Sequence, residues 1–183
     1  MFTGLSAFSL TPMNESGIDE AAFVGLIERL AMAGVDAIGA LGSTGNYAYL
    51  QLTERMRIAQ WWVAHAGRVP VMIGIGALRT RDVLTLAEQA QQIGASAVLL
   101  APVSYQTLTQ DEVFSLYETV TRTLSIPLCV YDNPGTTHFT FSDELHGRIA
   151  QLSNVASIKI PGLPLSTEAS RSRIEGLRAR IPS

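Results

Sequence analysis

Six short and almost uninterrupted apolar runs constrain this chain most. Glycine or proline bounds them, and they do not alternate apolar with polar residues, as strands with one face in water do. Continuous hydrophobicity over so few residues predicts strands buried on both faces, which is typical of a parallel sheet covered by helices. The six predicted strands span Gly4–Leu10, Asp36–Leu41, Pro70–Ile75, Ala97–Val103, Pro127–Asp132 and Val155–Ile160.

Segments with helical periodicity separate the apolar runs. Thr53, Thr109 and Ser142 are predicted N-caps, because acidic residues follow each of them in what would be the first helical turn. Gly34 and Gly94 stand where a helix should end. The predicted helices span Asp19–Met32, Thr53–His65, Arg79–Ile93, Thr109–Leu124, Ser142–Leu152 and Ser166–Arg180.

The strand and helix units recur about every thirty residues, as repeated supersecondary units do. The similar phrases Ala33–Ile38 and Ile93–Val98 each lead from a helix into the next strand. Right-handed crossovers of this kind form either an open, doubly wound sheet or a closed (β/α)8 barrel, and periodicity does not choose between them. The length of 183 residues favours the doubly wound sheet, because a complete barrel typically takes about 250 residues.

Composition narrows the class of protein. The chain is 47% apolar and 16% charged, which predicts one soluble domain over residues 1–183. Its net charge of −3, without a long run of either sign, gives no support for a nucleic-acid partner. Cys129 is the only cysteine and cannot close an internal disulfide. No signal peptide or membrane-spanning run is evident, so we expect a cytoplasmic protein without a membrane partner.

Two adjacent hydroxyls, those of Ser43 and Thr44, lie between glycines directly after the second predicted strand. Backbone N–H groups and hydroxyls at such a position can hold an anion, such as a carboxylate or a phosphate. A tight turn whose glycines only supply positive φ is an equally simple interpretation. A nucleotide-binding loop is less favoured, because the chain lacks the GxGxxG and GxxxxGK[ST] patterns.

Lys159 stands in the otherwise apolar sixth predicted strand and is the only lysine of the chain. If that strand is central, its lysine is desolvated, which disfavours the ammonium form and leaves an amine that can attack a carbonyl. Arginine cannot form an imine, so Lys159 is the one side chain available for Schiff-base chemistry. The alternative is a lysine at a strand end whose charged head reaches water.

Two tyrosines follow neighbouring predicted strands. Tyr131 ends the fifth strand, directly before an Asp-Asn-Pro-Gly segment, so that its hydroxyl would face the strand ends. Tyr105 lies in the loop after the fourth strand. Either could instead be a half-buried aromatic residue whose hydroxyl is bonded to backbone.

Five short motifs, taken together, resemble the landmarks of one family in order and at closely similar spacings. They are Leu10–Met13, Gly42–Gly45, Pro102–Tyr105, Val130-Tyr131 with Pro134, and Ser157–Lys159. The family is that of dihydrodipicolinate synthase and N-acetylneuraminate lyase, the class I pyruvate-dependent aldolases. The resemblance implies a (β/α)8 TIM barrel in place of the doubly wound sheet suggested by length.

The resemblance also implies roles for individual residues. Lys159 would form the imine with a 2-oxo acid, usually pyruvate, and Tyr131 would relay protons at the reacting atoms. Ser43 would link two tyrosines of a proton relay and contact substrate, and Tyr105 would be the tyrosine donated across a subunit interface. Thr44 would bind the carboxylate of the 2-oxo acid. No cofactor is implied, and a homo-oligomer, either a dimer or a tetramer, is expected.

Two positions depart from the family pattern. Thr136, which would contact the second substrate, stands where synthases of the family have an arginine that binds a carboxylate. Threonine cannot replace a guanidinium fork, so we expect a lyase, aldolase or dehydratase that uses a different second substrate. Asn46 stands where glutamate is common. His138 could face the substrate, whereas His65 and His146 lack the spacing of metal ligands, and no metal site is expected.

The end of the chain is the largest departure. A barrel with six βα units lacks the seventh and eighth strands and the last helices, which suggests truncation and leaves the activity of this chain open. Two further alternatives stay open. One is a catalytically inactive barrel that serves as a binding protein, and the other is a doubly wound phosphate-binding domain.

Overall fold

Six parallel strands form one sheet in the computed structural model, which describes residues 3–162 and 166–182. The strands follow one another across the sheet in the order β1-β4-β5-β6-β7-β8, and each pairs in parallel with the next. All six predicted strands are thereby confirmed. The strands are β1 (Ser6–Phe8), β4 (Ala37–Ala40), β5 (Val71–Gly74), β6 (Ala97–Leu100), β7 (Leu128–Tyr131) and β8 (Val155–Lys159).

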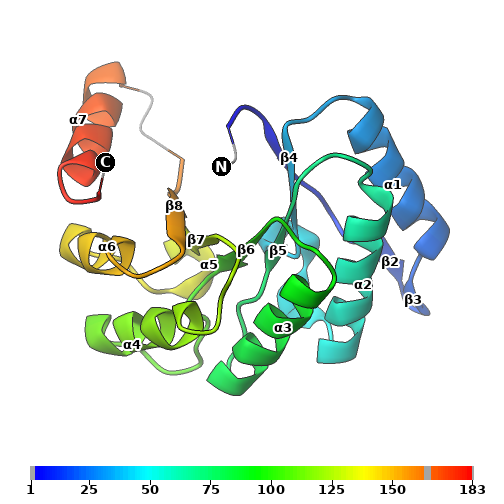
Figure 1. Ribbon diagram of the computed structural model, residues 1–183, viewed down its shortest axis with the longest axis horizontal. Coiled ribbons are helices and arrows are strands. Elements are labelled where there is room, and N and C mark those ends of the chain that lie inside the picture. The colour runs from blue at the N-terminus through cyan, green and yellow to red at the C-terminus, as the bar shows by residue number, and fades with distance from the viewer. Residues whose placement is uncertain (1–2, 163–165, 183) are drawn as a thin grey trace.

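Helices alternate with the strands and lie along the outer side of the curved sheet, each packed against the next (Figure 1). They confirm the six predicted helices to within a few residues at each end. The helices are α1 (Glu20–Met32), α2 (Leu52–His65), α3 (Thr80–Gln92), α4 (Gln110–Thr121), α6 (Asp143–Ala150) and α7 (Thr167–Arg178).

The strand order decides between the two folds that periodicity left open. A doubly wound sheet reverses its strand order at a switch point and carries helices on both faces. Here the order follows the sequence without reversal, and the helices lie on one side (Figure 1). The described residues therefore form six βα units of a barrel wall, and the doubly wound prediction from chain length was wrong.

The apolar core has two parts, one on each side of the sheet. The larger part fills the space between strands and helices, and its biggest fully buried side chains include Trp62, Tyr117 and Phe23. The smaller part lines the concave side of the sheet and includes Met72, Leu99, Cys129 and Tyr131, with Phe8 packed against them. The ring of Phe8 can lie there because Gly39 has no side chain: a Cβ at Gly39 would come within 2.3 Å of that ring.

The residues of the two edge strands are less buried than those of the middle strands. Every residue of the four middle strands is buried, whereas β1 and β8, which each have one neighbouring strand among the described residues, are mostly half-buried. The described edges thus carry backbone groups without a strand partner, a costly arrangement for a parallel sheet.

Some short elements were not predicted from the sequence. They are the hairpin of β2 (Met13–Asn14) and β3 (Gly17–Ile18), the 3₁₀ turns η1 (Ser43–Gly45) and η2 (Tyr47–Tyr49), and helix α5 (Pro134–Thr137). The capping predictions held for Thr109 and Ser142 but failed for Thr53, since α2 begins after Gln51. Gln51 and Glu54 form a reciprocal capping box there, which satisfies the free N–H groups two residues earlier than expected.

Candidate active site

Lys159 and Tyr131 are the last residues of adjacent strands and lie opposite each other in the register of β7 and β8. The backbone N–H of Asp132 donates to the carbonyl of Lys159 at 2.9 Å, which holds the two strand ends together. The Lys159 Nζ lies 4.5 Å from the centre of the Tyr131 ring and 5.1 Å from that of Phe8. The single lysine thus sits between two aromatic rings at the carboxyl end of the sheet.

The expected desolvation of Lys159 is only partly met. Lys159 is half-buried, because β8 is an edge strand among the described residues and has a neighbouring strand on one side only. The condition that the strand be central therefore fails in this structure.

The loop after β4 reaches the same end of the sheet through a tight backbone approach. Leu41 is buried and adopts a left-handed conformation with φ of 56°, which is unusual for a branched apolar residue and turns the chain toward Ser43. Its carbonyl oxygen lies where a Cβ on Gly74 would be 2.0 Å away, so only glycine fits there. The buried guanidinium of Arg55 donates to the carbonyls of Gly74 and Gly76 at 2.9 and 2.8 Å, and thereby fixes the end of β5.

Three polar side chains from the loops after β4 and β7 form a cluster with the hydroxyl of Tyr131, the last residue of β7. The amide Nδ2 of Asn133 donates to the Tyr131 hydroxyl at 2.9 Å and to the Ser43 hydroxyl at 3.2 Å. The hydroxyls of Tyr131 and Ser43 are 3.4 Å apart, and those of Ser43 and Thr136 are also 3.4 Å apart. Asn133 and Thr136 belong to the turn that opens α5, so this unpredicted helix places two members of the cluster.

Two predicted site residues stand outside the cluster. Thr44 is exposed on η1, and no hydrogen bond in the described part of the chain joins its side chain to the others. Tyr105 is 91% exposed in the loop after β6. His138 is exposed at the end of α5, in a left-handed conformation. Among residues 3–162 and 166–182, no group of histidine, cysteine and acidic side chains could hold a metal ion.

A cavity of about 370 Å³ adjoins the hydroxyl cluster. Ser43 and Thr136 open into it, so the cavity and the cluster share two residues. Its polar groups are hydroxyls and an amide, and no side chain that lines it carries a charge. The lining residues are Ser43, Asn46, Tyr47, Ala48, Tyr49, Val103 and Thr136.

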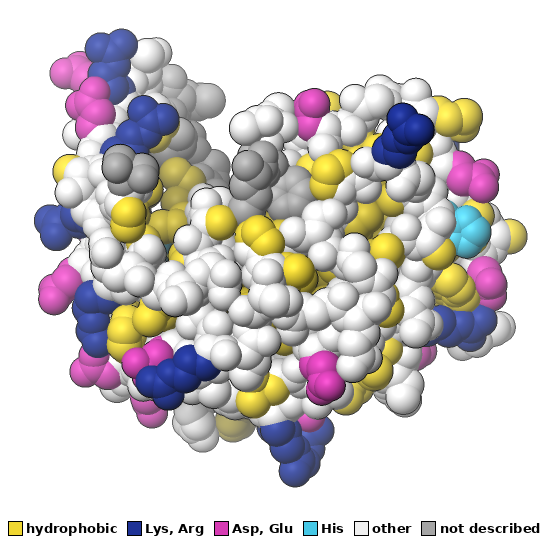
Figure 2. Space-filling view, viewed as in Figure 1, with side chains coloured by type: hydrophobic (Ala, Val, Ile, Leu, Met, Phe, Trp, Pro, Cys, Tyr) yellow, Lys and Arg dark blue, Asp and Glu magenta, His cyan; other side chains and the backbone are white. Residues whose placement is uncertain are grey.

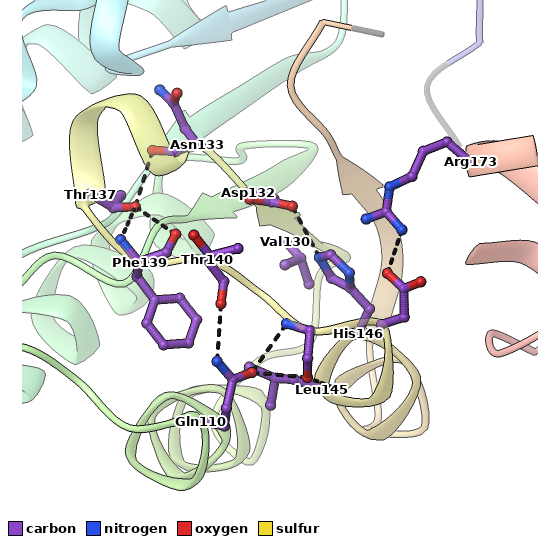
Figure 3. A network of polar contacts seen from close by, with 12 residues as sticks. Gln110, Val130, Asp132, Asn133, Thr137, Phe139, Thr140, Leu145, His146 and Arg173 are labelled. Atoms are coloured by element: carbon purple, nitrogen blue, oxygen red, sulfur yellow. Dashed lines mark hydrogen bonds and ion pairs between the residues drawn. The ribbon is translucent and has the colours of Figure 1, made fainter. Parts of the chain in front are cut away.

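Behind the strand ends, Asp132 and His146 form a buried pair on the helix side of the sheet (Figure 3). The His146 Nε2 lies 3.4 Å from the Asp132 Oδ2, and the imidazole stacks on Phe141 with ring centres 4.9 Å apart. Burial lowers the pKa of His146 to about 4, with a further contribution from the Arg173 guanidinium. Burial also raises the pKa of the Asp132 carboxyl. His146 is therefore neutral at pH 7.

Cys129 is the other nucleophile near Lys159, and it is buried on the concave side of the sheet. Burial raises the pKa of its thiol, so the thiolate needed for nucleophilic attack is scarce at pH 7. The amine of Lys159 is thus the better placed nucleophile at this end of the sheet.

The face of the molecule seen in Figure 2 gives no sign of a polyanion-binding site. In Figure 2, basic and acidic side chains are scattered around the visible face and do not gather into a patch of one sign. None of the helices in the described ranges has the length and apolar character needed to cross a bilayer.

Comparisons of the sequence and the structure with known proteins identify the family to which the chain belongs. The sequence profile of the Dihydrodipicolinate synthetase family matches residues 1–167. The chain is 33% identical over 160 residues to the 4-hydroxy-tetrahydrodipicolinate synthase of Phenylobacterium zucineum, a match that covers 87% of this chain and 54% of that enzyme. It is 31% identical over 181 residues to the enzyme of the same name from Afipia carboxidovorans, covering 98% and 59% of the two chains.

Solved structures of dihydrodipicolinate synthases resemble the fold of this chain. The dihydrodipicolinate synthase of Agrobacterium tumefaciens superposes with a TM-score of 0.92 at 45% identity, covering 100% of this chain and 61% of that one. The enzyme of Acinetobacter baumannii, solved with pyruvate, gives a TM-score of 0.88 at 27% identity over 99% and 62% of the two chains. The chain thus spans little more than half of the relatives it matches, and over that length it belongs to the dihydrodipicolinate synthetase family.

Proposed function

We propose that this chain carries the imine-forming half of a lyase or aldolase that acts on pyruvate or a related 2-oxo acid. The observation that carries the proposal is the position of Lys159, the only lysine, whose Nζ lies 4.5 Å from the Tyr131 ring at the ends of two paired strands. The pyruvate bound to the Acinetobacter baumannii relative supports the substrate class.

The proposed chemistry starts with the neutral amine of Lys159. It attacks the C2 carbonyl of the 2-oxo acid, and loss of water leaves an imine. The imine nitrogen can carry positive charge, so a proton on C3 becomes acidic and its removal gives an enamine. The enamine then forms or breaks a bond to a second substrate.

The roles proposed for the other residues rest on their contacts with one another and, for Tyr131, on its distance to Lys159. Tyr131, through its hydroxyl, is the proposed acid and base at the reacting atoms, and Ser43 accepts its proton at 3.4 Å. Thr44, exposed beside Ser43, is the proposed partner of the substrate carboxylate. Thr136 faces the adjoining cavity, where the second substrate would enter.

Assembly and location complete the proposal. Tyr105 is 91% exposed, so it could reach the site of a neighbouring copy. We therefore propose a homo-oligomer, a dimer or tetramer, in the cytoplasm, in which the residues 1–183 act as one domain. The absence of charged groups in the cavity lining favours a second substrate other than an aldehyde with a carboxylate.

Borohydride trapping tests the proposal. Incubation with pyruvate and borohydride should add one reduced adduct, and peptide mapping should place it on Lys159 because every other basic side chain except the histidines is an arginine. Lys159→Arg keeps the charge and should abolish the adduct. Labelling that survives this substitution would move the chemistry to the amino terminus and refute the assignment. A chain that binds pyruvate but traps none would instead be a binding protein.

A further inference from the structure

The amine of Lys159 is held by aromatic rings and not by polar partners. Among residues 3–162 and 166–182, its Nζ makes no hydrogen bond and no ion pair, and it lies instead over the rings of Tyr131 and Phe8. Lysine is a long, flexible side chain that loses much rotamer freedom when it is fixed in one place. Because Lys159 also lies half-buried on an edge strand, the position of its amine depends on these two rings.

Phe8 supplies the ring that comes from the opposite edge of the sheet. It is the last residue of β1, just as Tyr131 ends β7 and Lys159 ends β8. Since β1 and β8 are the two outermost strands, the Phe8 ring approaches Lys159 over the concave side of the sheet. The distances of 5.1 and 4.5 Å from Nζ to the two ring centres are within the range of cation–π attraction.

The Phe8 ring rests on a glycine of the neighbouring strand. Phe8 pairs with Gly39 in the register of β1 and β4. The three atoms nearest to a Cβ on Gly39 would all belong to the Phe8 ring, at 2.3–2.6 Å. Gly39 does not have a positive φ, so the backbone conformation does not require glycine there. The close approach of the ring does.

We propose that Phe8 is a positioning residue that holds the amine of Lys159 beside Tyr131 for its attack on the 2-oxo acid. This inference rests on the proposed function. Phe8 has no polar side-chain atom and takes no part in proton transfer. Its ring restricts Lys159 to the conformers in which the amine lies near Tyr131. An amine that is already in place loses less freedom when it attacks the carbonyl, which speeds imine formation.

The single lysine makes this positioning measurable without substrate. Protein labelled with ¹³C-lysine should give one ε-methylene NMR signal, because Lys159 is the only lysine. Protons over the face of an aromatic ring are shielded, so this signal should lie upfield of its position in the urea-unfolded chain. Phe8→Leu removes the ring but keeps an apolar side chain, and should move the signal part of the way back. Phe114→Leu removes another half-buried ring, which lies 4.4 Å from the Arg148 guanidinium, and should leave the signal in place.

Borohydride trapping measures the consequence for imine formation. Phe8→Leu should lower the rate of adduct formation at saturating pyruvate by about tenfold, because fewer conformers place the amine correctly. The half-saturating pyruvate concentration should change little, since Phe8 acts on the lysine and not on the substrate. Gly39→Ala offers a second route to the same loss, because its methyl group displaces the ring while Phe8 is kept. In the Phe8→Leu background, Gly39→Ala should add little further loss.

The outcomes separate the two proposals. If the unmodified chain traps no pyruvate, the proposed function fails, and the role of Phe8 in imine formation fails with it. If it traps pyruvate and folded Phe8→Leu traps equally fast, only the role of Phe8 is overturned. A lysine signal that stays in place in Phe8→Leu overturns it too, because the ring then does not hold the side chain. A higher half-saturating concentration at an unchanged maximal rate would assign Phe8 to substrate binding and contradict positioning.

Discussion

Position 136 holds a neutral residue in the lining of the uncharged cavity that adjoins the hydroxyl cluster. Thr136 lines this cavity, and its side chain hydrogen-bonds with Ser43 and with the carbonyl of Asn133. A guanidinium fork at this position would bind a carboxylate in a bidentate manner, whereas a hydroxyl offers one donor. Arg55 cannot serve as the carboxylate-binding arginine instead. Its two terminal nitrogens donate to backbone carbonyls of β5 and the residues after it, and its guanidinium is stacked on the Tyr47 ring.

We predict that aspartate semialdehyde is a poor second substrate, although the curated relatives carry the name of a synthase. Its carboxylate would lose charge-assisted bonds typically worth about 1.5–3 kcal/mol, or roughly one to two decades in rate constant. The measurement is kcat/KM with pyruvate and a panel of neutral, hydroxylated and charged aldehydes. Aspartate semialdehyde ahead of every other aldehyde would contradict the prediction.

Thr136→Arg sharpens the same comparison. The ratio of kcat/KM for aspartate semialdehyde to that for a neutral aldehyde should rise by about one decade or more, because the new guanidinium binds only the charged substrate. The value for aspartate semialdehyde itself should rise, because its carboxylate gains a bidentate partner. Thr136→Gln, which adds bulk and an amide without charge, is the matched control and should leave the ratio unchanged.

At this scale, residue chemistry predicted part of the site. Lys159 and Tyr131 could be identified because a lone lysine and a tyrosine each stand at the end of an apolar strand, and the structure brings them together. Asn133 could not, because its contacts join loops 90 positions apart, from Ser43 to Asn133, and an Asn-Pro pair in sequence reads as an ordinary turn. The half-burial of Lys159 was also not predictable, since it depends on which strand forms the edge.

Among the elements, local signals were sufficient for the repeating strands and helices. Apolar runs, acidic residues in first helical turns and glycines at helix ends each act within a few residues, so they can be recognised in the sequence. Gly34 and Gly94 indeed have the positive φ expected at a helix end. The misplaced start of α2 has a local cause too, because Gln51 with Glu54 competes with Thr53 as a cap. The short α5 escaped prediction because one helical turn has no periodicity to detect.

The contact between β7 and α6 depends on buried titratable groups. His146 is fully buried against Phe141 and faces Asp132 from α6, while Arg173 of α7 pairs with Asp143 nearby (Figure 3). Because burial lowers the pKa of His146 from 6.5 to about 4, the folded state favours the neutral imidazole. This contribution to stability is complete above pH 6.5 and is lost as the pH falls toward 4.

We therefore predict acid destabilisation that depends on His146. The free energy of unfolding should fall by on the order of 2 kcal/mol between pH 7 and pH 4.5, reduced by Asp132, whose raised pKa acts in the opposite direction. His146→Gln removes the titration and should flatten the profile. Urea unfolding at both pH values measures the change, and exposed His65→Gln is the control. An equally steep profile in His146→Gln would assign the acid sensitivity to other groups.

For the molecule as a whole, stability should vary across the sheet. The four middle strands are buried and paired on both sides, whereas β1 and β8 are mostly half-buried and have one strand partner each among the described residues. Local opening costs little where few apolar contacts are lost. The residues of the proposed chemistry therefore lie on both kinds of strand: Tyr131 on the buried β7, and Lys159 on the half-buried edge strand β8.

Amide hydrogen exchange measured by mass spectrometry tests this gradient. We predict the slowest exchange in β5, β6 and β7, and the fastest strand exchange in β1 and β8, because each edge strand leaves part of its N–H groups without a strand partner in the described structure. Raising the protein concentration separates two accounts of the edges. Protection of β1 and β8 that grows with concentration, while β6 stays constant, would show that a second copy covers them. Uniform protection across all six strands of a dilute monomer would contradict the gradient, and would mean that burial in this sheet does not set the cost of opening it.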